Sequence, residues 1–173
     1  KRDRSTDLAT FTFFQIGLIH PSKGQMETVR ALALVRKQRP EARLIIAGTG
    51  RDRELLATII RTGQQDAVEL AGYVEDPISM MFKCDAFVSA SRWEAFGRAM
   101  VEAMACGLPV IGHASGGTTE ILHDGKNGLV YKKDECDLSE AMLKLMNDRE
   151  AARIMGEQAH LSARDNFTVE RSA

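Results

Sequence analysis

Residues 86–111, AFVSASRWEAFGRAMVEAMACGLPVI, indicate the fold most directly. Ala86–Ser89 is a short apolar run typical of a buried strand, and a helical stretch follows over about 97–106. Gly107 is a residue type that commonly ends a helix, as is the proline that opens the next apolar run, Pro109–Ile111. A strand, a helix and a second strand in this order predict one unit of a parallel sheet.

The same alternation continues on both sides of this unit. Further strand-like apolar runs lie at 11–17, 44–47, 68–71 and 128–131. A helix is expected to begin at Ser22, where Gln25 completes an S-x-x-Q capping box. The remaining helices are expected over about 55–60, 78–83, 138–145 and 150–164. The pattern predicts a Rossmann-like three-layer α/β/α sandwich with a six-stranded, mostly parallel sheet.

We expect one folded domain over residues 11–165. A flexible N-terminal segment, 1–10, precedes it, and a tail, 166–173, follows it. The chain starts with lysine rather than methionine, and the first strand-like run begins almost at once. These features indicate a piece of a longer protein, so a reaction is expected to need residues outside this chain.

The composition excludes several classes of protein. Hydrophobic residues make up 44% and charged residues 27% of the 173 residues, which is typical of an ordinary globular domain and excludes disorder. No apolar run approaches the roughly 18 residues of a membrane span. The 23 basic and 24 acidic residues give a net charge of -1, which argues against a nucleic-acid-binding surface. Three cysteines without C-x-x-C spacing favour a reduced, cytoplasmic compartment.

Ligands of open parallel sheets bind beyond the carboxyl ends of the strands. In the loop after the first strand, Lys23 is expected in the first turn of a helix, where the backbone favours an anion over a cation. A bound anion would resolve that conflict, and a solvated lysine is the alternative. The next loop, Gly48-Thr49-Gly50, resembles a dinucleotide fingerprint, but Arg53 replaces its third glycine. That replacement argues against a NAD site.

Residues 91–120 carry the strongest indication of chemistry. Glu94 lies on the loop before Gly97, and Glu102 lies inside the helix that follows. Both carboxylates are expected to face a cleft above Gly97, where backbone amides bind phosphate and carboxylates accept sugar or ribose hydroxyls. An ordinary surface pair between Glu102 and Arg98 is the alternative. A second glycine-rich loop, with Gly116-Gly117 before a helix, is another candidate cradle for an anion.

Taken together, these segments resemble the C-terminal half of group 1 (GT4-type) retaining glycosyltransferases, which have the two-domain GT-B fold. The most specific element is Glu94-x7-Glu102, whose second glutamate begins the run Glu-Ala-Met-Ala-Cys-Gly-Leu-Pro-Val. Gly48-Thr49-Gly50, Gly72-Tyr73-Val74 and Gly116-Gly117-x-x-Glu120 occur in the expected order. The resemblance covers about residues 11–165.

The resemblance implies that this half binds a nucleotide-sugar donor, a UDP- or GDP-hexose, and transfers the hexose with retention at the anomeric carbon. Lys23 matches the lysine that contacts the donor diphosphate. Glu94 matches the glutamate that binds hexose hydroxyls, and Glu102 matches the one that holds the ribose. We therefore expect Lys23 and Glu94 to act in catalysis. The acceptor is expected to bind a missing N-terminal domain.

Other positions are expected to contact the donor through the backbone. Phe96 and Gly97 match positions whose amides approach the diphosphate or sugar, and Val74 matches the position that meets the base. Gly50, Gly116 and Gly117 complete the expected binding set. We expect no metal ion and no separate cofactor, no nucleic-acid partner, and no membrane contact from this chain. Membrane association of the intact protein is left open.

One position departs from the family pattern. The family usually has an arginine directly after the glycine of the first strand, and here that residue is Leu18. His20 and Arg98 are the candidate replacements. The missing arginine motivates one alternative function, a non-catalytic module that has lost donor binding. A separate alternative is a sugar-nucleotide epimerase of the same fold, which would need acid–base groups at the sugar, and the Glu94-x7-Glu102 pattern argues against it.

Overall fold

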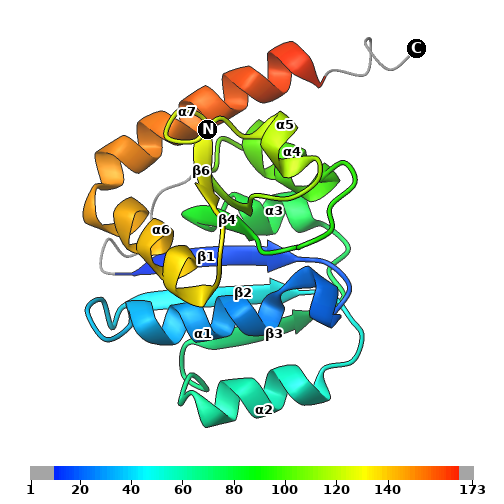
Figure 1. The fold of residues 1–173 in the computed structure, drawn as a ribbon, viewed down its shortest axis with the longest axis vertical. Helices are drawn as coiled ribbons and strands as arrows, with labels where there is room; N and C mark the ends of the chain where they lie inside the picture. The colour runs from blue at the N-terminus through cyan, green and yellow to red at the C-terminus, as the bar shows by residue number, and fades with distance from the viewer. Residues whose placement is uncertain (1–9, 168–173) are drawn as a thin grey trace.

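The computed structural model describes residues 10–167, which form a six-stranded parallel sheet covered by helices on both faces (Figure 1). The strands are β1 (Phe11–Ile16), β2 (Ala42–Ala47), β3 (Val68–Gly72), β4 (Ala86–Ser89), β5 (Val110–His113) and β6 (Gly128–Tyr131). They lie in the order β3-β2-β1-β4-β5-β6, and every neighbouring pair is parallel. The three-layer sandwich expected from the sequence is confirmed, with a sheet that is wholly parallel.

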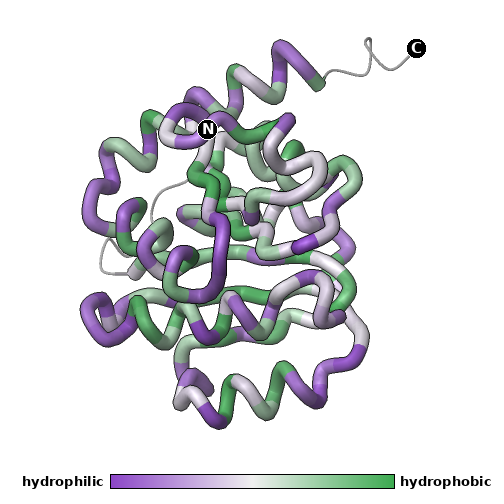
Figure 2. The backbone as a smooth tube through the Cα atoms, viewed as in Figure 1, coloured by the Kyte–Doolittle hydropathy of each residue, from purple (hydrophilic) through white to green (hydrophobic). Residues whose placement is uncertain are grey.

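The helices are η1 (Pro21–Lys23), α1 (Gln25–Val35), α2 (Arg53–Arg61), α3 (Pro77–Met81), α4 (Arg98–Ala105), α5 (Thr118–Ile121), α6 (Glu135–Asn147) and α7 (Arg149–Asn166). On one face of the sheet α1 packs against α2 and α6, and on the other α4 packs against α3 and α7. The apolar residues in Figure 2 follow the strands, whereas polar and apolar residues alternate along the helices.

The core consists of two apolar clusters, one on each face of the sheet. Successive strand residues point to opposite faces, so Phe13 belongs to one cluster and Phe14 to the other. Of the four methionines of α3 and α4, Met81, Met100 and Met104 are fully buried in the second cluster, and Met80 packs partly buried against it.

The sheet reverses its strand order between β1 and β4. From β1 the chain builds β2 and β3 on one side and then returns to place β4 on the other side of β1. The loops that leave β1 and β4 therefore lead to helices on opposite faces, α1 and α4. Such a crossing leaves a crevice at the carboxyl ends of the two strands, which is where open α/β sheets bind their ligands.

The first helix begins later than its sequence predicts. Ser22 lies in η1, where its hydroxyl contacts His20 Nδ1 at 2.8 Å, and Gly24 is the N-cap of α1 with φ +70°. The side-chain amide of Gln25 donates to the Leu18 carbonyl instead of completing a capping box. A Cβ on Gly24 would lie 2.3 Å from the Ala90 carbonyl oxygen, so this glycine also permits the turn to pack on the end of β4.

The ends of the chain are described only in part. Of the N-terminal segment expected over 1–10, residues 1–9 lie outside the described residues, as do residues 168–173 of the expected tail. Asn166, which we assigned to the tail, is the last residue of α7. The ring of Phe167 contacts the ring of Phe96 edge-on, with 6.1 Å between the ring centroids.

Candidate functional site

A cavity of about 420 Å³ opens at the carboxyl ends of β1 and β4, where the strand order reverses. The end of β1 contributes Gln15 to its lining, and η1 contributes Lys23. The loop after β4 and the first turns of α4 line the other side with Glu94, Gly97, Arg98 and Glu102. Four of the predicted site residues are therefore brought together: Lys23, Glu94, Gly97 and Glu102.

Lys23 and Glu94 form an ion pair across the cavity. The Nζ of Lys23 lies 3.0 Å from Oε2 of Glu94, and both side chains are partly exposed. The other carboxylate oxygen of Glu94 accepts a hydrogen bond from the Gly97 amide at 3.3 Å. Gly97 has φ +71° and is the N-cap of α4, which has no side-chain cap. A lysine, a carboxylate and the start of α4 therefore meet at one point. The sequence predicts Glu94 beside Gly97, but it predicts Lys23 in the first turn of the first helix, whereas Lys23 lies in η1, before α1 begins at Gln25.

Glu102 faces the same cavity from inside α4. Its carboxylate lies 3.8 Å from Arg98 Nε, one turn earlier, so the alternative surface pair is present. The contact is long, and the Arg98 side chain is 89% exposed. Exposed ion pairs of this kind contribute about 0–1 kcal/mol, so the pair leaves Glu102 available for a ligand.

A buried acid fixes the loop that carries Glu94. Glu27 of α1 is almost fully buried and accepts hydrogen bonds from the Tyr131 hydroxyl at 2.8 Å and from Arg92 Nη2 at 2.9 Å. Arg92 also donates to the Lys133 carbonyl, and its amide donates to the Ser22 carbonyl. The pKa of Tyr131 is raised above its ordinary value, mainly by burial and then by the nearby Glu27 carboxylate. Its hydroxyl therefore keeps its proton and stays a hydrogen-bond donor.

The second glycine-rich loop supports the same segment from the other side. The Gly117 amide donates to the Glu94 carbonyl at 2.8 Å, and a Cβ on Gly116 would lie 2.3 Å from that oxygen. Gly116 and Gly117 thus allow two backbones to approach closely. They are not among the residues that line the cavity, and their contact with a donor stays a prediction.

Three other predicted residues lie outside this lining. Gly50 forms a bridge with Ile19, and a Cβ there would lie 2.4 Å from the Ile19 carbonyl oxygen. The ring of Phe96 is exposed apart from its contact with Phe167. Val74 follows β3 and packs half-buried against the cluster beneath α3 and α4. Their roles toward a donor stay predictions, because no ligand contact tests them.

Sequence reasoning did not identify three residues that shape the site: Gln15, Glu27 and Arg92. Gln15 is 3% exposed, and its amide donates to the Lys23 carbonyl at 2.8 Å. Gln15 gives a signal in the sequence, because it is a lone amide in the apolar run of β1. Glu27 gives none, because an acid in the first turn of a helix is ordinary and only the structure shows that it is buried. Arg92 gives no local signal, because its partner Glu27 lies 65 residues earlier.

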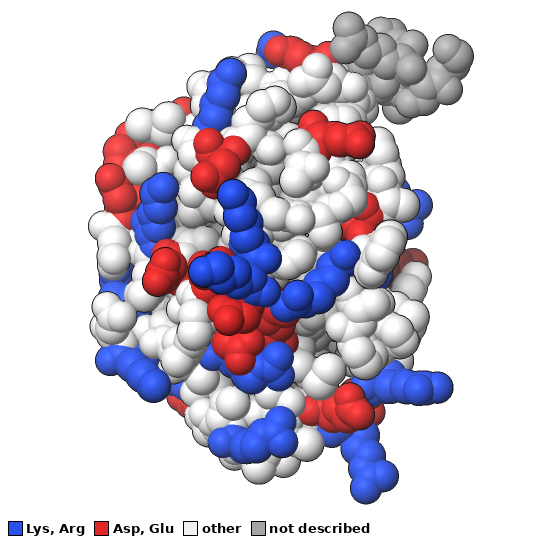
Figure 3. All heavy atoms as spheres, viewed as in Figure 1, with Lys and Arg blue, Asp and Glu red and all other residues white. Residues whose placement is uncertain are grey.

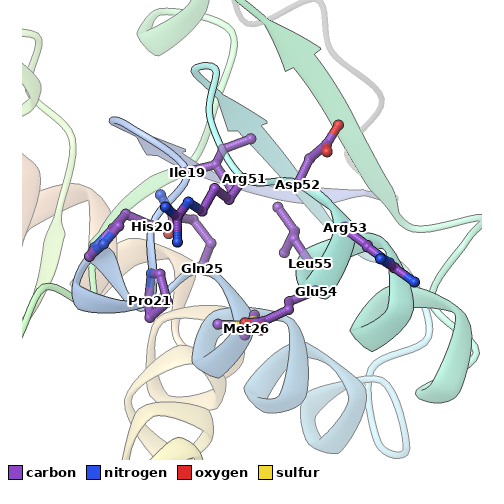
Figure 4. Close-up of a pocket in the computed structure, with 10 residues that line it drawn as sticks. All are labelled: Ile19, His20, Pro21, Gln25, Met26, Arg51, Asp52, Arg53, Glu54 and Leu55. Carbon is purple, nitrogen blue, oxygen red and sulfur yellow. The ribbon is translucent and has the colours of Figure 1, made fainter.

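A second cavity, of about 350 Å³, lies between the start of α1 and the start of α2 (Figure 4). Arg51 extends toward His20 across this cavity, whereas Arg53 points away from it. Its floor is apolar, with Ile19, Met26 and Leu55. Among the described residues, none of the charged side chains that line it forms an ion pair, in contrast to the cavity at β1 and β4.

Charges elsewhere are mixed. On the face drawn in Figure 3, basic and acidic side chains lie next to one another, in agreement with the net charge of -1.

Within residues 10–167 no group of three or more His, Cys, Asp or Glu side chains is arranged to hold a metal ion. No helix in the same range is long and apolar enough to cross a membrane. The expected cytoplasmic location stays a prediction.

Known proteins show the same fold and sequence pattern. The family model for group 1 glycosyl transferases matches residues 2–161. The chain is 35% identical over 140 residues to the poly(glycerol-phosphate) alpha-glucosyltransferase of Bacillus subtilis (strain 168), covering 79% of this chain and 21% of that protein. It is 33% identical over 160 residues to a GDP-mannose-dependent monoacylated alpha-(1-6)-phosphatidylinositol monomannoside mannosyltransferase of Corynebacterium glutamicum, covering 86% and 42%.

A solved structure extends the likeness to three dimensions. The crystal structure of Anabaena Alr3699/HepE in complex with UDP and glucose matches 94% of this chain with a TM-score of 0.89 and 27% sequence identity. The match covers 46% of that chain. This chain therefore spans less than half the length of each of these three proteins.

Proposed function

This chain belongs to the group 1 glycosyltransferases, and we propose that it binds the nucleotide-sugar donor, a UDP- or GDP-hexose. The observation that carries the proposal is the cavity at β1 and β4, in which Lys23, Glu94, the Gly97 amide and Glu102 meet. The similar Anabaena protein was crystallised with UDP and glucose, which supports a nucleotide-sugar ligand here.

Each group has a chemical task in this proposal. The bond between the hexose and the diphosphate breaks, so negative charge develops on the leaving diphosphate. Lys23 and the backbone amides at the start of α4 stabilise that charge, and preorganised donors of this kind supply large electrostatic stabilisation. Glu94 binds hexose hydroxyls, and Glu102 accepts hydroxyls of the ribose. These roles need no metal ion or separate cofactor.

The same proposal covers the whole reaction. We propose that the hexose is transferred with retention at the anomeric carbon, and that a second, N-terminal domain of the intact protein binds the acceptor. The chain spans 21% and 42% of the length of the two curated relatives, which leaves room for such a domain. This chain is expected to bind a nucleotide but to transfer little or no sugar by itself.

A binding titration tests the proposal. Trp93 adjoins Glu94 and is exposed, so its fluorescence is a probe for the cavity. We expect saturable binding of one of UDP, GDP and ADP, followed by fluorescence and calorimetry. The variant Glu102→Ala should weaken that binding on the order of tenfold, because a hydrogen bond to a charged group is worth about 1.5 kcal/mol or more.

Glu140→Ala is the matched control, since Glu140 is an exposed glutamate of α6 and is expected to leave binding unchanged. Calorimetry that shows no binding of any of the three nucleotides would contradict the proposal and favour a module that has lost its donor. Equal binding by wild type and Glu102→Ala would contradict the role of Glu102. Product analysis on the intact protein separates transfer from epimerisation.

A further inference from the structure

The cavity at β1 and β4 has balanced charges before any ligand enters. Of the described residues that line it, two are cationic, Lys23 and Arg98, and two are acidic, Glu94 and Glu102. Each cation lies beside one of the acids: Lys23 with Glu94 at 3.0 Å, and Arg98 with Glu102 at 3.8 Å. A diphosphate brings further negative charge, so these cations must exchange partners if the cavity is to hold it.

Arg98 stands at a position that is unfavourable for a cation. It is the first residue of α4, whose N-terminus has neither a side-chain cap nor an acidic residue in its first turn. The start of a helix carries partial positive charge, which repels a guanidinium and attracts an anion. The other helices of at least eight residues, α1, α2, α6 and α7, each have an acid in the first turn. An anion bound over α4 would supply the missing negative charge.

A second observation also points to a polar ligand in this cavity. Gln15 lines it and is 3% exposed, and its Oε1 is buried with no hydrogen-bond partner among residues 10–167. A buried polar atom without a partner costs free energy. The side-chain nitrogen of Gln15 already donates a hydrogen bond to the Lys23 carbonyl. An unpaired acceptor in a cavity that is also lined by two cations suits a ligand that carries both hydroxyl groups and phosphates.

We propose that Arg98 is the second cation that binds the donor diphosphate, together with Lys23. When the donor binds, Arg98 leaves Glu102 for the phosphates, and Glu102 becomes free to accept the ribose hydroxyls. Because the contact between Arg98 and Glu102 is long and exposed, breaking it costs little free energy. A guanidinium also matches phosphate oxygens in two parallel hydrogen bonds. This inference rests on the proposed donor-binding function.

The test compares a nucleoside diphosphate with its nucleoside. Calorimetry is carried out on the 173-residue chain with whichever of UDP, GDP and ADP binds, and with the corresponding nucleoside. Arg98→Gln should weaken diphosphate binding on the order of tenfold, the low end for losing a charge-assisted hydrogen bond, and should leave nucleoside binding unchanged. Arg98→Lys should recover part of the lost affinity for the diphosphate, because lysine restores the positive charge but cannot form bidentate hydrogen bonds.

Arg53→Gln is the matched control. Arg53 is also the first residue of a helix, is exposed, and points away from the second cavity (Figure 4). Arg53→Gln should change neither the affinity for the nucleoside diphosphate nor the affinity for the nucleoside. Equal losses for the diphosphate and the nucleoside in Arg98→Gln would overturn the proposal, because Arg98 would then act by positioning Glu102. Unchanged diphosphate binding would also overturn it.

These outcomes can be told apart from a failure of the proposed function. If the wild-type chain binds none of the three diphosphates, both proposals are wrong. If it binds one and Glu102→Ala weakens that binding while Arg98→Gln does not, only the role of Arg98 is wrong. Thermal unfolding of each variant verifies folding, and the high exposure of the Arg98 side chain leads us to expect no change in stability.

Discussion

Two loops at the carboxyl edge of the sheet contain glycine and lead into a helix that begins with arginine, yet they form different cavities. The loop after β4 leads to Arg98, and the loop after β2 leads to Arg53. The first loop is held by side chains and backbone from three segments: Glu27 of α1, the Ser22 carbonyl of η1 and Gly117 before α5. The second is held by backbone hydrogen bonds, such as those of Ile19 with Thr49 and Arg51.

The difference shows what distinguishes a binding site from a surface hollow. In the cavity at β1 and β4, charged side chains from separate segments are paired, and a buried acid fixes the loop behind them. Around the second cavity the charged side chains of residues 51–54 are exposed, and among the described residues they form no ion pair (Figure 4). Preorganised charge favours a specific polar ligand, because the protein orders those groups during folding rather than on binding.

The largest expected effect comes from breaking the contact between η1 and β4. Gly24→Ala would place a Cβ 2.3 Å from the Ala90 carbonyl oxygen, in a left-handed conformation with φ +70°. We expect a loss of about 2–4 kcal/mol in the free energy of unfolding, from overpacking and backbone strain. Nucleotide affinity should fall as well, since Lys23 moves with the turn. Urea unfolding and calorimetry measure the two effects.

Gly63→Ala is the control for backbone strain alone. Gly63 has nearly the same conformation, φ +68°, but a Cβ there would meet nothing within 4 Å. It should cost only about 1–2 kcal/mol and leave nucleotide affinity unchanged. If the two variants were equally stable and bound nucleotide equally well, the close approach of η1 to β4 would not matter for the site.

The sequence predicts the fold well because its signals are local. Each of the six strands is an apolar run of residues such as Leu44–Ala47, and parallel order follows from the helices between them. The ligand edge follows in turn from the direction of the strands. Lys23, Glu94 and Glu102 were predicted from the loops that follow β1 and β4, and the structure places them around one cavity.

The features that sequence reasoning missed depend on contacts between distant segments. Ser22 and Gln25 match a capping box, but contact with the end of β4 favours Gly24 as the cap. Arg92 lies exposed on the loop after β4, and nothing near it in sequence reveals its bond to Glu27. Local patterns therefore predict where ligand groups lie, whereas the groups that fix them require the three-dimensional structure.

A smaller effect is expected from weakening the buried acid behind the loop. Glu27→Gln keeps the size of the side chain but replaces one acceptor with a donor, which then faces Arg92 or Tyr131. We expect a loss of about 1–3 kcal/mol in the free energy of unfolding, since a buried hydrogen bond to a charged group is left unmade. Nucleotide affinity should fall several-fold, because the Glu94 loop loses its anchor.

Glu41→Gln is the control for removing an ion-paired glutamate. Glu41 pairs with Arg39 at 2.8 Å, but its side chain is more exposed than that of Glu27. We expect a change of about 0–1 kcal/mol and unaltered nucleotide affinity. Similar losses of affinity in Glu27→Gln and Glu41→Gln would show that the anchor is not specific to the cavity at β1 and β4.

The smallest expected effect is a pH dependence that sharpens the same comparison. His113, at the end of β5, is buried beside Tyr131, and in the described part of the chain neither of its ring nitrogens has a hydrogen-bond partner. Burial first, and then the charge of Arg92, lower the pKa of His113, whereas Glu27 and the nearby backbone of Lys132 act in the opposite direction. The network behind the Glu94 loop therefore includes a histidine that resists protonation.

Because the unfolded chain binds this proton more readily than the folded chain, the contribution of His113 is fully present above the ordinary histidine pKa of 6.5. It is lost as the pH falls below that value, by less than the ceiling of about 1.4 kcal/mol per pH unit for one proton. Urea unfolding at pH 7.5 and 5.5 should show a shallower pH dependence in His113→Leu than in wild type. The same change at the exposed His123, His123→Leu, should leave the slope as it is, and equal slopes in all three proteins would mean that His113 takes up a proton without cost.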